Sequence, residues 1–189
     1  MASVLLNHGA AVNQAASNGS SPLWASCHEG HSKVVSLLLA HGASINQRSN
    51  NGVTSLCIAS HFGHLEVAAL LLTKGASINL ATNNGGTPLL KAAHEGHTEV
   101  AALLLDNGAA INQATVNGSA PLIKACNHHR SEVVSLLLTR GADVCRHRTR
   151  PMPLGCPRLP SPNGLTGRVP PRRHTCCYIT PVAGESGQE

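Results

Sequence analysis

The chain is 189 residues long, with 12% charged residues, only 2% aromatic residues and a formal net charge of +5 at neutral pH. No apolar run approaches the roughly 20 residues that a membrane-spanning helix requires. The N-terminus also lacks the basic and apolar regions of a secretion signal. We therefore expect no membrane insertion and an intracellular location, in the cytoplasm or the nucleus.

Glycines recur along the chain at a fixed interval of 33 residues. One row consists of Gly9, Gly42, Gly75, Gly108 and Gly141, a second of Gly19, Gly52, Gly85 and Gly118, and a third of Gly30, Gly63 and Gly96. His129 stands where the third row would continue. A period of this length indicates a small unit that has been copied and stacked, rather than a globular domain with a central cleft.

The period divides residues 1–145 into a half repeat, 1–16, and repeats at about 17–49, 50–82, 83–115 and 116–145. Each repeat predicts an extended finger, a short helix, a glycine turn and a longer helix that ends at a glycine. Prolines that suit the first helical position occur at Pro22, Pro88 and Pro121. Hydroxyl side chains that suit the N-cap precede the short helix at Ser21, Thr54 and Thr87. The longer helix of the first complete repeat has a broad apolar face, made by Val34, Val35, Leu37, Leu38 and Leu39.

The fourth repeat departs from this pattern at two positions. Ala120 takes the place of the capping hydroxyl, which costs about 1 kcal/mol. His129 replaces a turn glycine, which costs on the order of 1 kcal/mol if its φ is positive. We expect this repeat to be the loosest, and we expect its longer helix to leave apolar surface at Val133, Val134, Leu136, Leu137 and Leu138.

The last segment, 146–189, differs sharply in composition from the repeats. It holds eight of the eleven prolines, and its seven arginines against two glutamates account for the net charge of +5. We expect disorder from about residue 147 onward. Three interpretations stay open: a plain basic linker, a tail that binds nucleic acid or an acidic partner, and non-native coding sequence from a shifted reading frame or a retained intron.

The repeat pattern resembles the ankyrin repeat family, over residues 1 to about 144. The motif Thr-Pro-Leu-His of that family appears here as Ser21-Pro22-Leu23-Trp24, Thr54-Ser55-Leu56-Cys57, Thr87-Pro88-Leu89-Leu90 and Ala120-Pro121-Leu122-Ile123. The histidine is absent from every copy, so we expect packing to replace its polar link. The resemblance implies an all-α solenoid of antiparallel helix pairs with β-turn fingers, whose fingers and first helices line a concave surface that binds other proteins.

No residue pattern predicts catalysis, a cofactor or a metal site. The chain has no nucleophile motif, no phosphate-binding loop after a strand and no paired carboxylates. Cys27, Cys57 and Cys126 fit small buried hydrophobes in a reducing compartment, and the adjacent Cys176 and Cys177 lack the spacing of zinc ligands.

Two columns of histidines recur with the repeat. His31, His64 and His97 precede the longer helices, where the resemblance implies that the ring fixes the turn. His28, His61 and His94 form a second column on successive layers about 8–10 Å apart, which is too far apart for chelation. We expect this second column to be exposed contact surface whose charge responds near pH 6.5.

The resemblance also indicates which positions contact a partner. They are Ser17, Ser20, His28, Glu29, Asn50, Val53, His61, Phe62, Asn83, Gly86, His94, Glu95, Val116, Ser119, Asn127 and His128. Lys91 and Lys124 follow the first-helix Leu90 and Ile123 and suggest a positive strip on the concave side, unless both simply extend into solvent. Phe62 is either an exposed aromatic anchor or a ring packed on a neighbouring helix. For Trp24, core packing is favoured over partner contact.

These features together predict a monomeric, non-catalytic module that binds a partner protein through its concave surface. Two alternatives stay open. One is binding of nucleic acid or an acidic ligand, through the basic tail only. The other is a fragment of a larger repeat scaffold that has no independent role.

Overall fold

In a computed structural model of the chain, the structure describes residues 8–144, and all that follows concerns these residues. Contacts divide the chain into two units, Met1–Asp143 and Val144–Glu189. The predicted tail, 146–189, and its proposed disorder lie outside the described residues.

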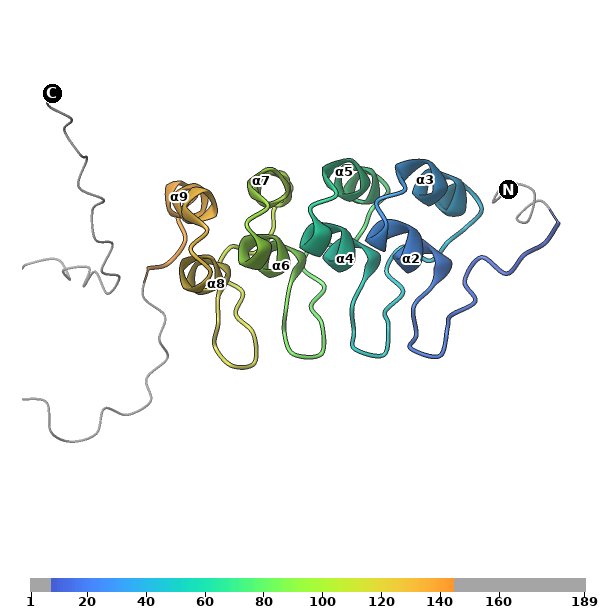
Figure 1. Cartoon of the computed structure of the whole chain (residues 1–189), viewed down its shortest axis with the longest axis horizontal. Coiled ribbons are helices and arrows are strands. Elements are labelled where there is room, and N and C mark those ends of the chain that lie inside the picture. The colour runs from blue at the N-terminus through green and yellow to red at the C-terminus, as the bar shows by residue number, and fades with distance from the viewer. Residues whose placement is uncertain (1–7, 145–189) are drawn as a thin grey trace, which may run out of the picture. The chain divides into compact units, whose positions relative to one another are not determined.

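The described part consists of four helix pairs in sequence (Figure 1). The pairs are α2 Pro22–His28 with α3 Ser32–Ala40, α4 Ser55–Phe62 with α5 Leu65–Thr73, α6 Pro88–Glu95 with α7 Thr98–Asp106, and α8 Pro121–Asn127 with α9 Ser131–Thr139. The short helices α2, α4, α6 and α8 lie side by side in one row, and the longer helices lie in a second row. The fingers extend from the row of short helices. The expected all-α solenoid is confirmed for these residues.

The predicted caps set where the short helices begin. The Thr87 hydroxyl accepts a hydrogen bond from the Leu90 amide at 3.2 Å, and Ser21 and Thr54 do the same in their own repeats. Proline occupies the first turn of α2, α6 and α8. At α8 the cap residue is Ala120, and no side chain bonds the first turn.

Apolar residues of the two helix rows form one continuous core. A leucine of each short helix and a valine and a leucine of each longer helix are at most 5% exposed: Leu23, Leu56, Leu89 and Leu122; Val35, Val67, Val100 and Val133; Leu38, Leu71, Leu104 and Leu137. Full burial of such a side chain contributes roughly 1.5–3 kcal/mol. The expectation that the whole apolar set of α9 leaves exposed surface is therefore wrong for Val133 and Leu137, because both are buried in the shared core. Leu138 does remain 38% exposed.

Neighbouring fingers are joined by hydrogen bonds near their tips. The amide of Asn50 donates to the carbonyl of Asn18 at 3.0 Å, and its side-chain Nδ2 donates to the carbonyl of Ser17 at 3.0 Å. Asn83 repeats both bonds one finger later. Val116 keeps only the backbone bond, to Asn84. The fourth finger is therefore held to its neighbour by fewer bonds.

The histidine before the longer helix of the second and third repeats bonds the preceding repeat rather than its own. Nε2 of His64 lies 3.0 Å from the carbonyl of His28, and Nε2 of His97 lies 3.0 Å from the carbonyl of His61. The fourth repeat carries Arg130 at this position, and its Nε donates to the carbonyl of His94 at 3.1 Å. The ring therefore fixes the helix end and glycine turn of the repeat before it.

This contact explains the turn glycines. A β-carbon added at Gly30 would lie 2.7 Å from the His64 ring, so the ring needs a glycine beneath it. His129 has a φ of 55°, the only positive φ at a non-glycine residue in the described part of the chain. It is exposed, because no described repeat follows to lay a side chain over it.

Restoring the repeat consensus in the fourth copy should stabilise the protein. We expect Ala120→Thr and His129→Gly each to raise the free energy of unfolding by about 1 kcal/mol, the first through a new cap and the second through relief of a left-handed φ. Urea denaturation measures both effects. Thr87→Ala is the reciprocal control and should lose about as much as Ala120→Thr gains, and an unchanged midpoint for Ala120→Thr would show that the cap is unimportant here.

Removal of a histidine ring before a longer helix should lower the free energy of unfolding only where that ring bonds a carbonyl of the preceding repeat. His97→Ala should lower the free energy of unfolding by about 1–2 kcal/mol, because the carbonyl of His61 loses its donor. His97→Arg should retain most of the stability, as Arg130 does at the same position. His31→Ala is the matched control, because among the described residues the His31 ring makes no hydrogen bond of this kind, unlike the His64 and His97 rings. Equal losses for His31→Ala and His97→Ala in urea denaturation would contradict this role.

Candidate functional site

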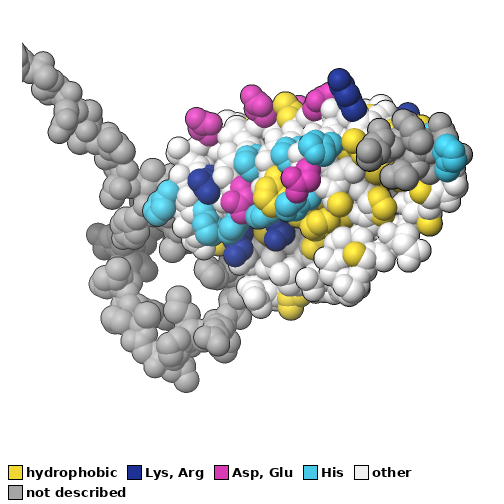
Figure 2. Space-filling model, turned by 45° about the vertical axis from the view of Figure 1, so that its right-hand side comes forward, with side chains coloured by type: hydrophobic (Ala, Val, Ile, Leu, Met, Phe, Trp, Pro, Cys, Tyr) yellow, Lys and Arg dark blue, Asp and Glu magenta, His cyan; other side chains and the backbone are white. Residues whose placement is uncertain are grey.

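The fingers and the short helices α2, α4, α6 and α8 together present one face of the repeat stack, which we call the inner face. Histidine, acidic and basic side chains gather with hydrophobic ones on the molecular face drawn in Figure 2. His28, His61 and His94 stand at or near the ends of successive short helices on the inner face, and all three are half-buried.

Phe62 is the exposed aromatic residue of this face. Its side chain is 42% exposed, and its ring packs edge-on against His28 at 4.5 Å and His61 at 4.8 Å between centroids. The His64 ring stacks on Phe62 with 6.2 Å between ring centroids, and the Trp24 ring stacks on His28 with 5.5 Å between centroids. The two interpretations of Phe62 are thus both met in part, because the ring is held by its neighbours and still offers apolar surface to solvent.

A polar cluster continues the histidine row toward the fourth repeat. Nδ1 of His94 lies 2.6 Å from Oε1 of Glu95, and Nδ1 of His61 lies 3.3 Å from the same oxygen without the geometry of a hydrogen bond. The rings of His94 and His128 lie 3.9 Å apart between centroids. One carboxylate oxygen therefore lies close to two imidazole rings from adjacent repeats.

The cluster is asymmetric in charge. Partial burial lowers the pKa of His61, and the nearby Glu95 carboxylate offsets this only in part. Burial opposes ionisation of Glu95, but the hydrogen bond from His94 and the positive charges of His94, His61 and Arg130 together outweigh it and leave the pKa of Glu95 below its ordinary value. At neutral pH His61 is therefore uncharged, whereas Glu95 carries its negative charge.

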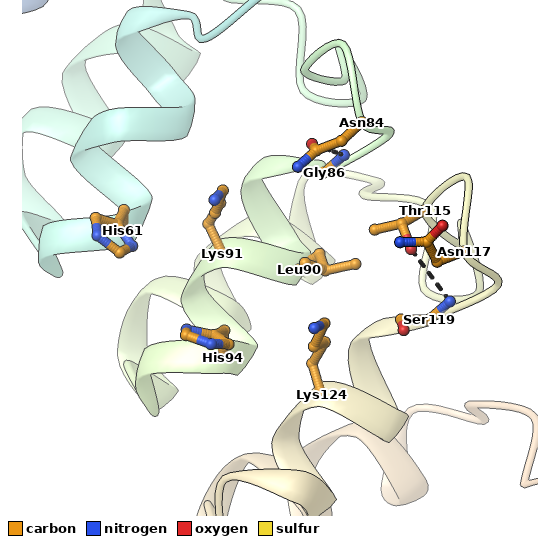
Figure 3. Close-up of a pocket in the computed structure, with 10 residues that line it drawn as sticks. All are labelled: His61, Asn84, Gly86, Leu90, Lys91, His94, Thr115, Asn117, Ser119 and Lys124. Atoms are coloured by element: carbon orange, nitrogen blue, oxygen red, sulfur yellow. Dashed lines mark hydrogen bonds between the residues drawn. The ribbon is translucent and has the colours of Figure 1, made fainter. Parts of the chain in front are cut away.

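A cleft of about 190 Å³ opens on the inner face between the third and fourth repeats (Figure 3). It is lined by His61 of α4, by Leu90, Lys91 and His94 of α6, by Lys124 of α8, and by Asn84, Gly86, Thr115, Asn117 and Ser119 of two adjacent fingers. The lining carries two lysines and no carboxylate. This chemistry suits a negatively charged group.

Gly86 contributes to the shape of the cleft by lacking a side chain. Its equivalents in the other repeats are Ser20, Val53 and Ser119. A β-carbon there would lie 3.6 Å from Cε of Lys91 and 3.0 Å from the Thr82 hydroxyl. The glycine therefore leaves free the space beside the Lys91 side chain.

The residues expected to contact a partner differ in how they are placed. Exposed positions are Ser17, Glu29, Asn50, Phe62, Asn83, Val116, Asn127 and His128, whereas Ser20, His28, Val53, His61, Lys91, His94, Glu95, Ser119 and Lys124 are half-buried. Gly86 is buried, so it shapes the cleft and offers no side chain. The amides of Asn50 and Asn83 already bond the preceding finger, which gives them a structural role. Asn84, Thr115 and Asn117 line the cleft but were not among the positions expected to contact a partner. Their residue types are typical of finger turns, so the sequence indicated only a structural role for them.

The residues at the position of the family's missing histidine make different contacts in different repeats. Cys57 is buried, and its thiol lies 3.6 Å from the carbonyl of Leu80, so a weak polar link survives there and the expectation of pure packing is wrong in the second repeat. The Trp24 side chain packs against the core, while its Nε1 has no hydrogen-bond partner. Burial raises the pKa of the Cys27 thiol to about 12 and raises that of Cys57 as well, so both thiols stay protonated.

Neither a metal centre nor a membrane span emerges from the described residues. Within 8–144, His, Cys, Asp and Glu side chains form no group of three that could hold a metal ion. None of the helices there combines the length and apolar character needed to cross a bilayer. The cysteine pair Cys176 and Cys177 lies outside the described residues.

Stacked helix pairs joined by projecting fingers define a repeat solenoid built from one copied unit. The sequence model of ankyrin repeats in three copies matches residues 1–82 and 75–148. These matches cover most of the chain, which therefore belongs to the ankyrin repeat family. Its members are generally protein-interaction modules and are typically non-catalytic. No curated protein matches the chain as a relative.

The charge state of the histidine cluster can be tested by NMR titration. We expect His61 to protonate with a midpoint below 6.5, and Glu95→Gln to lower that midpoint further by removing the charge that favours the imidazolium. Because the folded pKa of His61 lies below the unfolded value, the unfolded chain takes up the proton first, so stability should fall as the pH drops below about 6.5.

Glu29→Gln is the matched control for this titration. Oε1 of Glu29 lies 2.6 Å from Nδ1 of His28. Because this carboxylate pairs with His28 and not with His61, its loss should leave the titration midpoint of His61 unchanged. A His61 midpoint at or above 6.5 in the unsubstituted protein would contradict the lowered pKa.

Proposed function

We propose that this protein is a non-catalytic interaction module that binds a partner protein through the inner face. The observation that carries the proposal is the exposed, laterally supported Phe62 beside the histidine row. A partly exposed aromatic ring that its neighbours hold in place offers contact area at little cost in conformational entropy. Aromatic residues of this kind dominate the binding energy of many protein interfaces.

The surroundings of Phe62 support the same function. His28, His61 and His64 pack around the ring, and the expected contact positions add Asn, Ser and Glu side chains that suit the polar rim of an interface. The helix pairs beneath them share one core, so the contact residues are held in fixed relative positions before binding. A preorganised surface of this composition suits a reversible interaction with a folded or extended protein segment.

The residues proposed for contact follow from this arrangement. On the inner face we assign the central role to Phe62, His61 and His94, which lie on adjacent short helices. The other positions expected to contact a partner surround them, except Gly86, whose burial removes it from direct side-chain contact.

Substitution of the central residues should abolish capture of the partner. The unsubstituted full chain and a Phe62→Ala, His61→Ala, His94→Ala triple variant are immobilised at equal density, and proteins retained from a cell extract are quantified by mass spectrometry. We expect specific partners to be depleted at least about tenfold on the variant, because loss of an interface anchor costs about 2 kcal/mol or more.

Leu65→Ala serves as the matched control. Leu65 is 37% exposed, similar to Phe62, but it begins the longer helix α5 and is not among the proposed contacts. Its loss should leave capture unchanged. A triple variant that folds normally, as judged by its urea midpoint, and still retains the same partners would overturn the proposed surface.

A further inference from the structure

We propose that the cleft between the third and fourth repeats binds the carboxylates of an acidic, extended segment of the partner protein. This inference rests on the proposed function and assigns a chemical character to what the inner face recognises. The site comprises Lys91 of α6, Lys124 of α8 and the finger side chains Asn84, Asn117 and Ser119, and we call it the lysine cleft (Figure 3).

The two lysines lack acidic partners in the described part of the chain. Neither ammonium group forms an ion pair or a side-chain hydrogen bond there, although ion pairs occur elsewhere, as between Arg140 and Asp106. Both side chains are half-buried, and the cleft lining contains no carboxylate. Two like charges on adjacent helices in a recess repel one another, and an anion bound between them relieves that repulsion.

An acidic group beside two of the histidines that line the cleft is already engaged. Glu95 follows His94 on α6, and its Oε1 is shared by the His94 and His61 rings. Its carboxylate is held on the histidine side and is not part of the cleft lining. The positive charge of the lysine cleft therefore stays available to a ligand.

Neutral hydrogen-bond donors complete the site. Oδ1 of Asn84 accepts the Gly86 amide at 3.4 Å, which leaves the Nδ2 group of Asn84 free to donate. Ser119 and Asn117 stand on the neighbouring finger, and in Figure 3 Lys91 and Lys124 lie on either side of Leu90, on the helix side of the two fingers. Ammonium, amide and hydroxyl donors around a small apolar floor suit a carboxylate attached to a short alkyl chain.

Two lysines on adjacent helices match a segment that carries more than one acidic side chain. Their helices are adjacent in the stack, and packed helices lie about 8–10 Å apart. Side chains two residues apart in an extended segment point to the same side and lie about 7 Å from one another. Two acidic side chains at that spacing can therefore each face one of the two lysine-bearing helices.

The repeats themselves indicate that the lysines are not needed for folding. The slot of Lys91 and Lys124 is occupied by Ala25 in the first repeat and by Ile58 in the second. The same helix therefore forms with a small or a branched apolar residue at that position. Lys91→Ala and Lys124→Ile are changes that the repeat scaffold already accommodates.

The test is an NMR titration of the isotope-labelled full chain with a synthetic peptide of alternating Glu and Ser residues, beside a second peptide with Gln in place of Glu. We expect the acidic peptide to shift the backbone amides of residues 84–94 and 115–124. The Lys91→Ala, Lys124→Ile variant should bind it about tenfold more weakly, since each exposed ion pair contributes modestly. The Gln peptide should leave these amides unmoved.

A variant of equal charge separates the cleft from general attraction to a basic chain. Lys33→Ala, Lys74→Ala removes two exposed lysines of the longer-helix row and should alter the affinity less than twofold. Equal weakening by both double variants, shifts confined to the arginine-rich segment, or no shifts at millimolar peptide would each overturn the proposal.

The same variants distinguish this inference from the proposed function. If the partner is lost on the Phe62 triple variant but retained on Lys91→Ala, Lys124→Ile, the inner face binds protein and the lysine cleft is not its acidic pocket. If the acidic peptide binds the cleft while capture is insensitive to Phe62, His61 and His94, the cleft proposal stands and the aromatic centre is wrong.

Discussion

The helix pairs of this protein share one apolar core that runs from each pair to its neighbours. The valines and leucines that repeat every 33 residues, such as Val67 and Leu71, are buried in this core. A single pair would leave much of this surface in water, so stability arises from stacking. The stacking also brings the short helices and fingers into one row, and the inner face exists only because of that row.

The polar contacts between repeats follow the same repeat geometry. His64 and His97 each reach 36 residues back to a carbonyl at the end of a short helix, and the glycine below each ring makes the approach possible. These rings lie directly beside the residues of the candidate site, since the carbonyls that they bond belong to His28 and His61. Contacts that hold the stack together therefore also position the histidine row that we assign to binding.

The inner face changes character along the stack. Around the first two repeats it is aromatic, with Phe62 among imidazole rings, and around the last two it is a cationic cleft with amide and hydroxyl donors. The Glu95 carboxylate lies against the His94 and His61 rings and is not part of the cleft lining. A partner segment that combines an apolar residue with acidic ones would match both parts, and such a combination confers specificity more readily than either part alone.

The sequence by itself determined the repeat, its caps and its turns, because these depend on local rules. Hydroxyl caps, first-turn prolines and left-handed glycines act within a few residues, so Thr87, Pro88 and Gly108 could be assigned without any knowledge of neighbours. The defects of the fourth repeat, Ala120 and the positive φ of His129, followed from the same rules.

Only the tertiary structure decided how residues one period apart meet. It showed that the Gly-His rings bond the preceding repeat, that Asn50 and Asn83 tie the fingers together, that Val133 is covered and that Gly86 is buried. It also joined Lys91 and Lys124 with Asn84 and Asn117 into one cleft. A linear pattern specifies which side chains recur, but the distance between two copies depends on how closely their helices pack, and that packing is a property of the assembled stack.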